Sequence, residues 1–257
     1  MRNLLIVART CSNVHAVNGT RYVNATKRAI IQRCLASLVF SINQVTNHHV
    51  ELVVIDDHSD EKSKADVLNI IKHCKFPTEL LDCEKSGNGE TMRMVYQIVG
   101  ERAKDLWFHI EDDYLHKPEA IPDILDTVAA FNKNPNQFIA VNPHDDIWRY
   151  TRNIYESYLL LGPRRHYRTV KHTTYTFLSN IALFNRYKMI LDELVALTCA
   201  HEHSVENRSI NKIWAQPDVL LISPVPGLSF HLMDQSGKDP YLDFEELWNS
   251  VPTLWKN

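Results

Sequence analysis

Two clusters of carboxylate side chains each follow a short apolar run of the sequence. Asp56 and Asp57 come directly after VVI, and Glu111, Asp112 and Asp113 come directly after WFHI. Because ligands of open α/β sheets bind where parallel strands end, we expect both clusters to meet at one edge of a sheet. The alternative for the triplet is that it caps the helix that follows it, since Asp is a common N-cap. The second acidic cluster at a comparable strand end favours a binding role.

Adjacent carboxylates of this kind suit a hard divalent cation. Mg²⁺ and Mn²⁺ prefer oxygen ligands, and such an ion can bridge the two phosphates of a nucleoside diphosphate. A bridging ion stabilises the negative charge that develops on a departing diphosphate. The triplet therefore predicts Mn²⁺ or Mg²⁺ as cofactor and a substrate that carries a diphosphate.

The elements that must position these clusters alternate between strand and helix. Short apolar runs predict strands at residues 4–8, 51–55, 78–81, 106–110 and 138–141. Apolar residues at three- and four-residue spacing predict helices at residues 26–43, 65–74, 90–102 and 119–131. This alternation implies right-handed β-α-β crossovers and a mostly parallel central sheet flanked by helices.

The second half of the chain is less regular. Residues 147–176 are rich in Arg, His and Tyr and show no clean period, whereas 177–184 are apolar. A helix is predicted at 187–197 and a late strand at 219–222. Without an internal repeat or a convincing linker, we expect one domain over residues 1–257, with a donor half at 1–142 and an acceptor half with the C-terminal tail at 143–257.

Composition excludes several other classes of protein. The chain has 257 residues, of which 44% are hydrophobic, enough for one large α/β domain or two small ones. Its formal net charge is only −3 and its basic residues are scattered, so neither nucleic acid nor an anionic membrane is indicated as a partner. Thirteen histidines leave a metal site possible without locating one.

The cysteines and the N-terminus favour a soluble cytoplasmic protein. The five cysteines are widely spaced with no CxxC pair, so neither a zinc knuckle nor a disulfide framework is predicted. The first apolar run is too short for a secretory signal or a membrane span. The sequons at Asn18, Asn24 and Asn207 carry little weight without such a signal.

The order of the motifs resembles the donor-binding half of family-two glycosyltransferases. VVIDDHSDE follows the first strand and helix, a GNG loop and helix come next, and LWFHIEDDYLHKPEAI ends the match after roughly 140 residues. That family has the Rossmann-like glycosyltransferase-A (GT-A) fold. The resemblance implies that Asp57 or Asp56 contacts the nucleobase or ribose of a nucleotide-sugar donor, and that Glu111 and Asp113 approach the metal and the donor phosphates. The family usually has Asp where this chain has Glu111, which makes Asp113 the better candidate ligand and Asp112 the next.

The same resemblance assigns further residues to the donor site. Ala8, Arg9 and Thr10, at the end of the first strand, would line the base pocket, and Arg9 would reach a base or a phosphate. Arg93 follows the GNG loop where the family often has a donor-facing basic residue, and Lys85 is a weaker candidate. The alternative for Arg9 is an exposed strand end, and for Arg93 an ordinary exposed helix position.

The C-terminal tail adds a second, independent resemblance. PGLSFHLMDQSG is similar to an S-l-x-x-H-x-g-x-x-S segment near the end of many bacterial and viral members. Ser229, His231 and Ser236 hold related positions, with two fewer residues between the first serine and the histidine. The segment implies His231 as a third metal ligand through a neutral imidazole nitrogen. The alternative is an ordinary core or surface histidine.

A transferase that inverts configuration also needs a general base for the acceptor hydroxyl. CAHEHSVENRSINKIW offers Glu206 and Glu202, although it lacks the E-D-x-x-x-x-x-R-like pattern that the family often carries there. Either glutamate is alternatively a surface helix residue. Asp145 and Asp146 would hold the acceptor sugar or cap a loop. The aromatic and basic residues between Trp148 and Tyr175 would form an acceptor groove or simply pack together.

These observations predict a metal-dependent glycosyltransferase that moves a sugar from a nucleotide-diphosphate sugar to a carbohydrate or glycan acceptor, with inversion as a family-level expectation. One alternative is a non-catalytic nucleotide-sugar or carbohydrate-binding protein on the same scaffold. Another is a nucleotidyltransferase, which would need a Gly-rich phosphate loop after the first strand, where only Gly19 occurs. A dinucleotide-binding oxidoreductase is disfavoured because no GxGxxG follows a strand.

Overall fold

The computed structural model describes residues 1–13, 23–134, 136–152, 155–173, 175–232 and 239–255. Its centre is a nine-stranded sheet in the order β3-β2-β1-β4-β9-β6-β10-β8-β7, which is continuous through both halves of the chain. The strands of this sheet are β1 (Arg2–Thr10), β2 (His48–Asp56), β3 (Thr78–Asp82), β4 (Leu106–Ile110), β6 (Phe138–Val141), β7 (Leu159–Leu161), β8 (His166–Thr169), β9 (Phe177–Asn180) and β10 (Val219–Val225). A small antiparallel pair, β5 (Tyr114–His116) and β11 (Ser229–His231), lies beside it.

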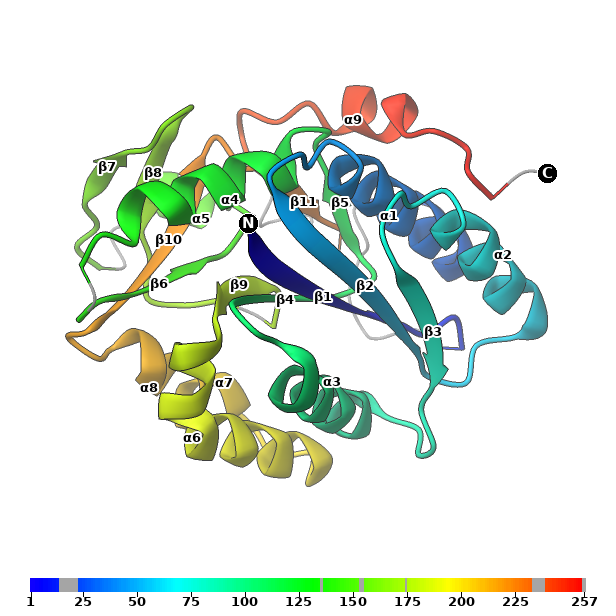
Figure 1. The fold of residues 1–257 in the computed structure, drawn as a ribbon, viewed down its shortest axis with the longest axis horizontal. Coiled ribbons are helices and arrows are strands. Elements are labelled where there is room, and N and C mark those ends of the chain that lie inside the picture. The colour runs from blue at the N-terminus through cyan, green and yellow to red at the C-terminus, as the bar shows by residue number, and fades with distance from the viewer. Residues whose placement is uncertain (14–22, 135, 153–154, 174, 233–238, 256–257) are drawn as a thin grey trace.

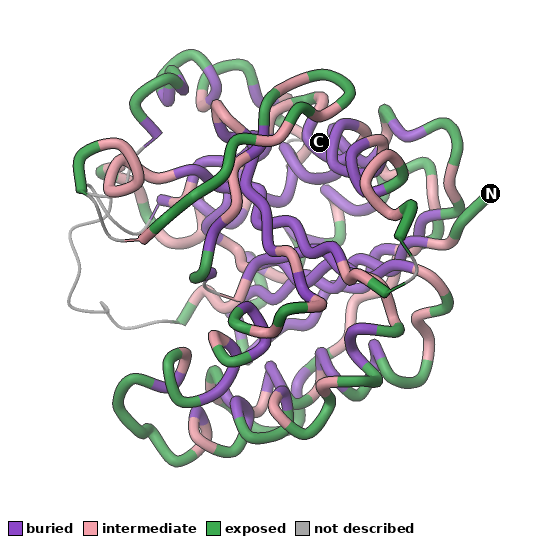
Figure 2. The backbone as a smooth tube through the Cα atoms, turned by 90° about the vertical axis from the view of Figure 1, so that its left-hand side faces the viewer, coloured by how far each residue is buried: buried purple, intermediate pink, exposed green. Residues whose placement is uncertain are grey.

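Helices cover both faces of the sheet, as Figure 1 shows. The helices are α1 (Lys27–Ile42), α2 (Glu61–Ile71), α3 (Asn88–Arg102), α4 (Ala120–Phe131), α5 (Trp148–Thr151), α6 (Ile181–Cys199), α7 (Val205–Arg208), α8 (Asn211–Trp214) and α9 (Phe244–Ser250). Helices α1, α2 and α4 pack on one face, and α3 and α6 pack on the other. Figure 2 shows the buried backbone in the centre and exposed segments along the outer surfaces.

The apolar run of β1 explains why this strand lies in the middle of the molecule. Leu4, Ile6 and Ala8 pack into the core under α1, whereas Leu5 and Val7 pack into the core under α3. A strand that is buried on both faces needs apolar residues at every position, not at every second one. The predicted mostly parallel sheet is confirmed: β1 pairs in parallel with β2 and β4, β2 with β3, and β6 with β10.

The second half departs from the β-α-β rule at two strands. Strand β9 runs antiparallel to both β4 and β6, and β8 runs antiparallel to β10. The segment without a clean period forms α5 and the β7–β8 hairpin at the edge of the sheet. Helix α6 begins at Ile181, earlier than predicted, because the Asn180 side chain accepts a hydrogen bond from the backbone of Leu183 at 2.8 Å.

Helix α2 also begins before its predicted start at residue 65. The Asp60 side chain accepts a hydrogen bond from the backbone N–H of Ser63 at 2.9 Å, which caps the helix at Glu61. Capping by a short polar side chain satisfies an unpaired N–H of the first turn. Within the described residues, no helix combines the length and apolar character that a membrane crossing needs.

Candidate functional site

The two acidic clusters lie at the same edge of the sheet. In the registers of the parallel pairs, Thr10 is opposite Asp56 and Ala8 is opposite Ile110, so β2 and β4 end on either side of β1. Cys11 lies between the clusters, because its backbone N–H donates to Asp112 Oδ2 at 3.0 Å and its thiol donates to the Asp57 carbonyl at 3.2 Å. The structure therefore brings together the carboxylates that the sequence pointed to.

The two aspartates after β2 have different surroundings. Asp56 is fully buried and accepts hydrogen bonds from the Thr10 hydroxyl at 3.2 Å and the Ser59 backbone at 2.9 Å. Its carboxylate holds the turn after β2. Asp57 instead accepts a hydrogen bond from the Gly87 N–H at 3.0 Å, in the GNG loop. Gly87 has φ of 122°, a backbone region that side chains rarely allow, so the loop needs glycine there to meet Asp57.

Arg9 is buried at the end of β1 and contacts both the start of α3, after the GNG loop, and the acidic triplet. Its guanidinium Nη2 lies 3.0 Å from Glu111 Oε1, and Nη1 donates to the Thr91 hydroxyl at 3.1 Å and to the Asn88 carbonyl at 3.1 Å. Burial raises the pKa of Glu111, and the positive charge of Arg9 opposes that effect. The predicted alternative of an exposed strand end is wrong, since Arg9 is 8% exposed.

Asp112, the middle residue of the triplet, is held by its own partners. Lys27, the first residue of α1, forms an ion pair with Asp112 Oδ1, and the Cys11 N–H occupies Oδ2. Burial works to lower the pKa of Lys27, but Asp112 and Asp113 outweigh it and raise that pKa. Both oxygens of Asp112 are therefore engaged with the protein itself.

Asp113 is the member of the triplet that faces the C-terminal tail. Its Oδ2 lies 3.5 Å from Nε2 of His231, and among the described residues its buried Oδ1 has no hydrogen-bond partner. Burial opposes ionisation of Asp113, but the charge and hydrogen bond of His231 hold the pKa of the carboxyl below its ordinary value. The His231 ring stacks on Tyr114 with centroids 4.6 Å apart. A buried carboxylate oxygen without a partner beside an imidazole nitrogen is a donor set that fits a divalent cation.

In the metal site that the sequence predicts, this pair would supply two protein ligands. No group of three or more His, Cys, Asp or Glu side chains arranged to hold a metal occurs in the part of the chain that the structure describes. Glu111, predicted beside Asp113 as a ligand, is turned to Arg9. The Ser229 hydroxyl forms a hydrogen bond with Nδ1 of buried His116 at 2.7 Å, so this serine has a structural role. Ser236 lies outside the described residues.

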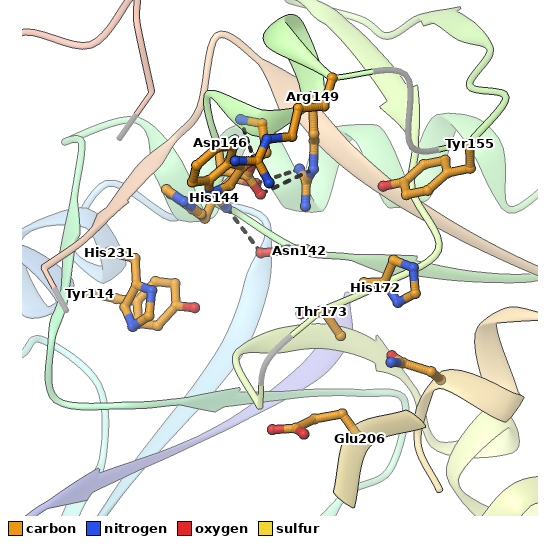
Figure 3. Close-up of a pocket in the computed structure, with 13 residues that line it drawn as sticks. Tyr114, Asn142, His144, Asp146, Arg149, Tyr155, His172, Thr173, Glu206 and His231 are labelled. Carbon is orange, nitrogen blue, oxygen red and sulfur yellow. Dashed lines mark hydrogen bonds and ion pairs between the residues drawn. The ribbon is translucent and has the colours of Figure 1, made fainter. Parts of the chain in front are cut away.

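A cleft of about 530 Å³ opens next to the Asp113–His231 pair (Figure 3). Tyr114 and His231 form one side of it, and Tyr155 and His172 form another. The cleft is lined by residues of the tail, of the loops around α5 and of the segment after α6: Tyr114, Asn142, His144, Asp146, Trp148, Arg149, Arg152, Tyr155, His172, Thr173, Glu206, Asn211 and His231. The predicted acceptor segment, Trp148 to Tyr175, thus contributes much of the wall.

The two candidate bases are separated by the fold. Glu206, in α7, lines the cleft and accepts a hydrogen bond from the Tyr175 hydroxyl at 3.1 Å. Glu202 is exposed and pairs with Arg208 at 2.9 Å, outside the cleft lining. Burial first, and then the charge and hydrogen bond of Glu206, raise the pKa of Tyr175, so its hydroxyl stays protonated and remains a donor.

Arg93 and Lys85 lie away from the acidic edge. Both line a separate cavity of about 640 Å³ beside α3. Arg93 lies 3.2 Å from Glu90 and 3.3 Å from Cys199 Sγ, and its side chain is 57% exposed. The structure therefore does not bring Arg93 next to Asp57 or Asp113.

Asp145 and Asp146 are engaged mainly with arginines. Asp145 is fully buried and pairs with Arg149 at 3.4 Å and Arg168 at 3.5 Å. Asp146 lines the cleft, pairs with Arg149 at 3.5 Å and accepts a hydrogen bond from the Trp148 N–H at 2.9 Å. Asp146 thus contacts the first residue of α5, whereas Ile147 is the N-cap of that helix.

Known proteins resemble this chain in fold but not in sequence. No family model matches the chain, and no curated protein matches it in sequence. The structure is similar to that of S. aureus TarS, with a TM-score of 0.51, 13% identity and coverage of 87% of this chain and 35% of TarS. It is also similar to S. aureus TarS 1-349, with a TM-score of 0.51, 12% identity and coverage of 92% and 59%.

A third similar structure is S. aureus TarS 1-349 in complex with UDP-GlcNAc, with a TM-score of 0.50, 12% identity and coverage of 98% and 62%. The chain has a GT-A type fold. At such low identity the likeness concerns the fold, and the chain spans between 35% and 62% of the length of these three chains. In this GT-A fold the acidic edge lies at the carboxyl ends of β1, β2 and β4, where α/β sheets bind ligands. The cleft lies beside it and includes residues that follow β4 and β6.

Sequence reasoning missed several side chains that organise this site. Lys27, Tyr114 and Tyr175 contact Asp112, His231 and Glu206. Tyr114 lies in the segment LWFHIEDDYLHKPEAI but had no expected role, and the other two belong to no motif. The helix start at Thr26 gave a weak signal for Lys27, because the N-terminus of a helix after a β-strand often lies near the ligand edge of the sheet. Tyr175 lay inside the predicted acceptor segment but without a role.

Proposed function

We propose that this chain is a metal-dependent glycosyltransferase that moves a sugar from a nucleotide-diphosphate sugar to a carbohydrate acceptor. The observation that carries the proposal is the pairing of Asp113 with His231 beside a cleft that Glu206 also lines. The GT-A fold supports it, since TarS, one protein of similar fold, was crystallised with UDP-GlcNAc.

In this proposal the carboxylate of Asp113 and the imidazole of His231 would hold Mn²⁺ or Mg²⁺. The ion, when bound, supplies positive charge that stabilises the departing diphosphate. Lys27 adds a positive charge behind the triplet through Asp112, and Arg9 holds Glu111 away from the ion. Asp57, Thr10 and the GNG loop would flank the nucleobase and ribose, because they surround the ends of β1 and β2.

Glu206 is the proposed general base. The Tyr175 hydroxyl donates to its Oε1, which fixes the carboxylate and leaves Oε2 to accept a proton from an acceptor hydroxyl. Thr176, next to Tyr175, accepts a hydrogen bond at 3.1 Å from the Glu111 N–H, so one loop touches both the triplet and the base. A base that faces the sugar from the side opposite the diphosphate would give an inverted product.

A thermal-shift experiment tests the proposal without knowledge of the acceptor. The melting temperature is measured with UDP, GDP, CDP and ADP, each with and without Mn²⁺. A nucleotide at 100 times its Kd stabilises the folded state by about 2.7 kcal/mol, which for a chain of this size raises the melting temperature by roughly 5 °C or more. We expect one nucleotide to stabilise the protein and Mn²⁺ to increase that shift.

The matched control is a carboxylate far from the site. Asp113→Asn should abolish the extra shift from Mn²⁺, whereas Asp192→Asn, an exposed residue on α6 that pairs with Lys188, should keep it. If no nucleoside diphosphate raises the melting temperature, or if Mn²⁺ adds nothing to any of them, the proposed donor site is wrong.

A further inference from the structure

Two cations lie over aromatic rings that line the cleft. The guanidinium of Arg152 lies 3.5 Å from the centre of the Trp148 ring, and Nζ of Lys171 lies 5.9 Å from the centre of the Tyr155 ring. Arg152, Trp148 and Tyr155 line the cleft, and Lys171 directly precedes its lining residue His172. Both cations are exposed, and among the described residues neither has a carboxylate at ion-pair distance.

Two other arginines in or next to this part of the cleft are neutralised by the protein. Arg149 pairs with Asp145 and Asp146, and Arg168 pairs with Asp145. Arg149 also donates to the Ser223 hydroxyl at 2.8 Å and to the His144 carbonyl at 3.2 Å, which leaves its side chain 7% exposed. These two arginines thus balance two aspartates. Within the described residues, Arg152 and Lys171 have no such carboxylate partner.

His172 follows Lys171 in the sequence and lines the cleft. His172 lies 5.6 Å from the Tyr155 ring, and Figure 3 shows both at the same side of the cleft. Partial loss of solvent around its ring, together with the charges of Arg149 and Lys171, lowers the pKa of His172. A neutral imidazole can donate one hydrogen bond and accept another, which suits sugar hydroxyls.

The carboxylate of Glu206 lies on a different part of the cleft lining (Figure 3) and is already hydrogen-bonded to Tyr175. If one hydroxyl of the acceptor lies at Glu206, the rest of the acceptor molecule would therefore extend along Tyr155, His172 and the two cations. Exposed Arg and Lys side chains without partners favour negative groups, because charge-assisted hydrogen bonds are stronger than neutral ones.

We propose that the acceptor is an anionic glycan, with a carboxylate or phosphate group bound by Arg152 and Lys171 while a hydroxyl of a neighbouring sugar reaches Glu206. This inference rests on the proposed function of the same cleft. It narrows the acceptor to glycans that carry negative charge, because a neutral glycan would gain no binding energy from the charges of Arg152 and Lys171.

Affinity gel electrophoresis tests the inference with three polymers of one backbone: dextran, carboxymethyl dextran and phosphorylated dextran. The formal net charge of the chain is −3, so non-specific attraction to the polyanions is disfavoured. The wild-type protein should be retarded by at least one charged polymer at a concentration roughly tenfold below that needed for dextran. Which charged polymer binds more tightly then distinguishes carboxylate from phosphate.

The double variant Arg152→Gln/Lys171→Gln should lose this preference for charged polymers. The matched control is Arg186→Gln/Lys188→Gln, which removes one arginine and one lysine from exposed positions on α6. Equal retardation of wild type by neutral and charged dextran, or equal loss in the two double variants, overturns the inference. Melting shifts with UDP and Mn²⁺ in the same variants report the donor site separately, so failure of the proposed function remains distinguishable.

Discussion

Nε2 of His231 lies 3.5 Å from Oδ2 of Asp113, although the two residues come from distant parts of the chain. The backbone fixes this relationship. His231 is opposite Tyr114 in the β5–β11 pair, and the Leu232 N–H donates to the Asp113 carbonyl at 2.9 Å. The small antiparallel sheet thus attaches the tail to the acidic edge and aligns an imidazole with a carboxylate.

The first prediction concerns the metal. Removal of either member of this pair, by Asp113→Asn or His231→Gln, should weaken Mn²⁺ binding in the presence of UDP by at least the roughly 10–100-fold that loss of a supporting residue costs other metal sites. Electron paramagnetic resonance of free Mn²⁺ measures the affinity. His203→Gln, an exposed histidine after α6, is the control. Unchanged Mn²⁺ affinity in His231→Gln would remove the tail from the metal site.

The second prediction separates the two glutamates. Glu206→Gln should lower the rate of sugar transfer at least about 100-fold, because general bases contribute on the order of 10²–10⁴-fold, whereas Glu202→Gln should change it less than about twofold. Release of nucleoside diphosphate, with water or a glycan as acceptor, provides the measurement. Donor binding by Glu206→Gln should stay intact in the melting assay. Equal effects of the two substitutions would show that neither is the base.

The parts of the fold that could be predicted depend on local patterns. The strand that ends at Ile110 has the bounds predicted from the sequence, because its five successive residues are all buried and form one uninterrupted apolar run. Asp113 and Asp57 could be singled out as candidates because each directly follows an apolar strand, and the carboxyl ends of parallel strands meet at one edge of the sheet. Helix starts were missed where a single side chain decides them, as Asp60 does for α2 and Asn180 for α6.

Contacts across the fold could not be predicted, because no local signal encodes them. Lys27 reaches Asp112 across 85 positions of the sequence, and Arg9 reaches Glu111 across 102. Arg93 shows the converse, since the resemblance implies a position that faces the donor, whereas the Arg93 side chain contacts Cys199 at the end of α6. Whether a basic side chain points to a site depends on the rotation of its helix, which its neighbours in space determine.

The third prediction is that Asp112 contributes mainly to stability. Asp112→Asn leaves the partly buried ammonium of Lys27 without the partner of its ion pair. Breaking a fully buried pair costs about 3–5 kcal/mol, so we expect a loss of at most that size. Urea denaturation measures the loss. Lys27→Met alone leaves Asp112 unpaired, and the double variant should recover much of the stability, because neither charge then remains buried. Additive losses in the double variant would mean that the pair is not coupled.

The fourth prediction compares two glycines of α3. A Cβ atom on Gly89 would lie 2.5 Å from Cys199 Sγ and 2.6 Å from the Cys199 backbone nitrogen, so Gly89→Ala should destabilise the protein by about 1–3 kcal/mol. Cys199→Ala should not rescue it, because the clash with the backbone remains. Gly100→Ala is the control: its Cβ would meet Phe184 at 3.6 Å, an ordinary contact, and Ala in a helix interior stabilises by about 0.5–1 kcal/mol. Thermal unfolding of the three variants distinguishes close helix packing from a general effect of the substitution.

The fifth prediction concerns pH and the buried His109. Both ring nitrogens of His109 lack hydrogen-bond partners within the described structure, and burial, with a smaller contribution from Arg9, lowers its pKa well below 6.5. His109 is therefore neutral in the folded protein. Below pH 6.5 the unfolded chain binds a proton there and the folded chain does not, so the free energy of unfolding falls as the pH falls.

The contribution of one such histidine is a slope of up to about 1.4 kcal/mol per pH unit. His116 adds a similar effect, because burial lowers its pKa to about 3. Urea denaturation between pH 4.5 and pH 8 should show a shallower slope in His109→Leu than in the wild type, whatever the offset in stability at pH 8. His73→Gln, at an exposed position, should keep the wild-type slope. Identical slopes in wild type and His109→Leu would mean that the buried imidazole is protonated in the folded protein, which its surroundings in β4 do not support.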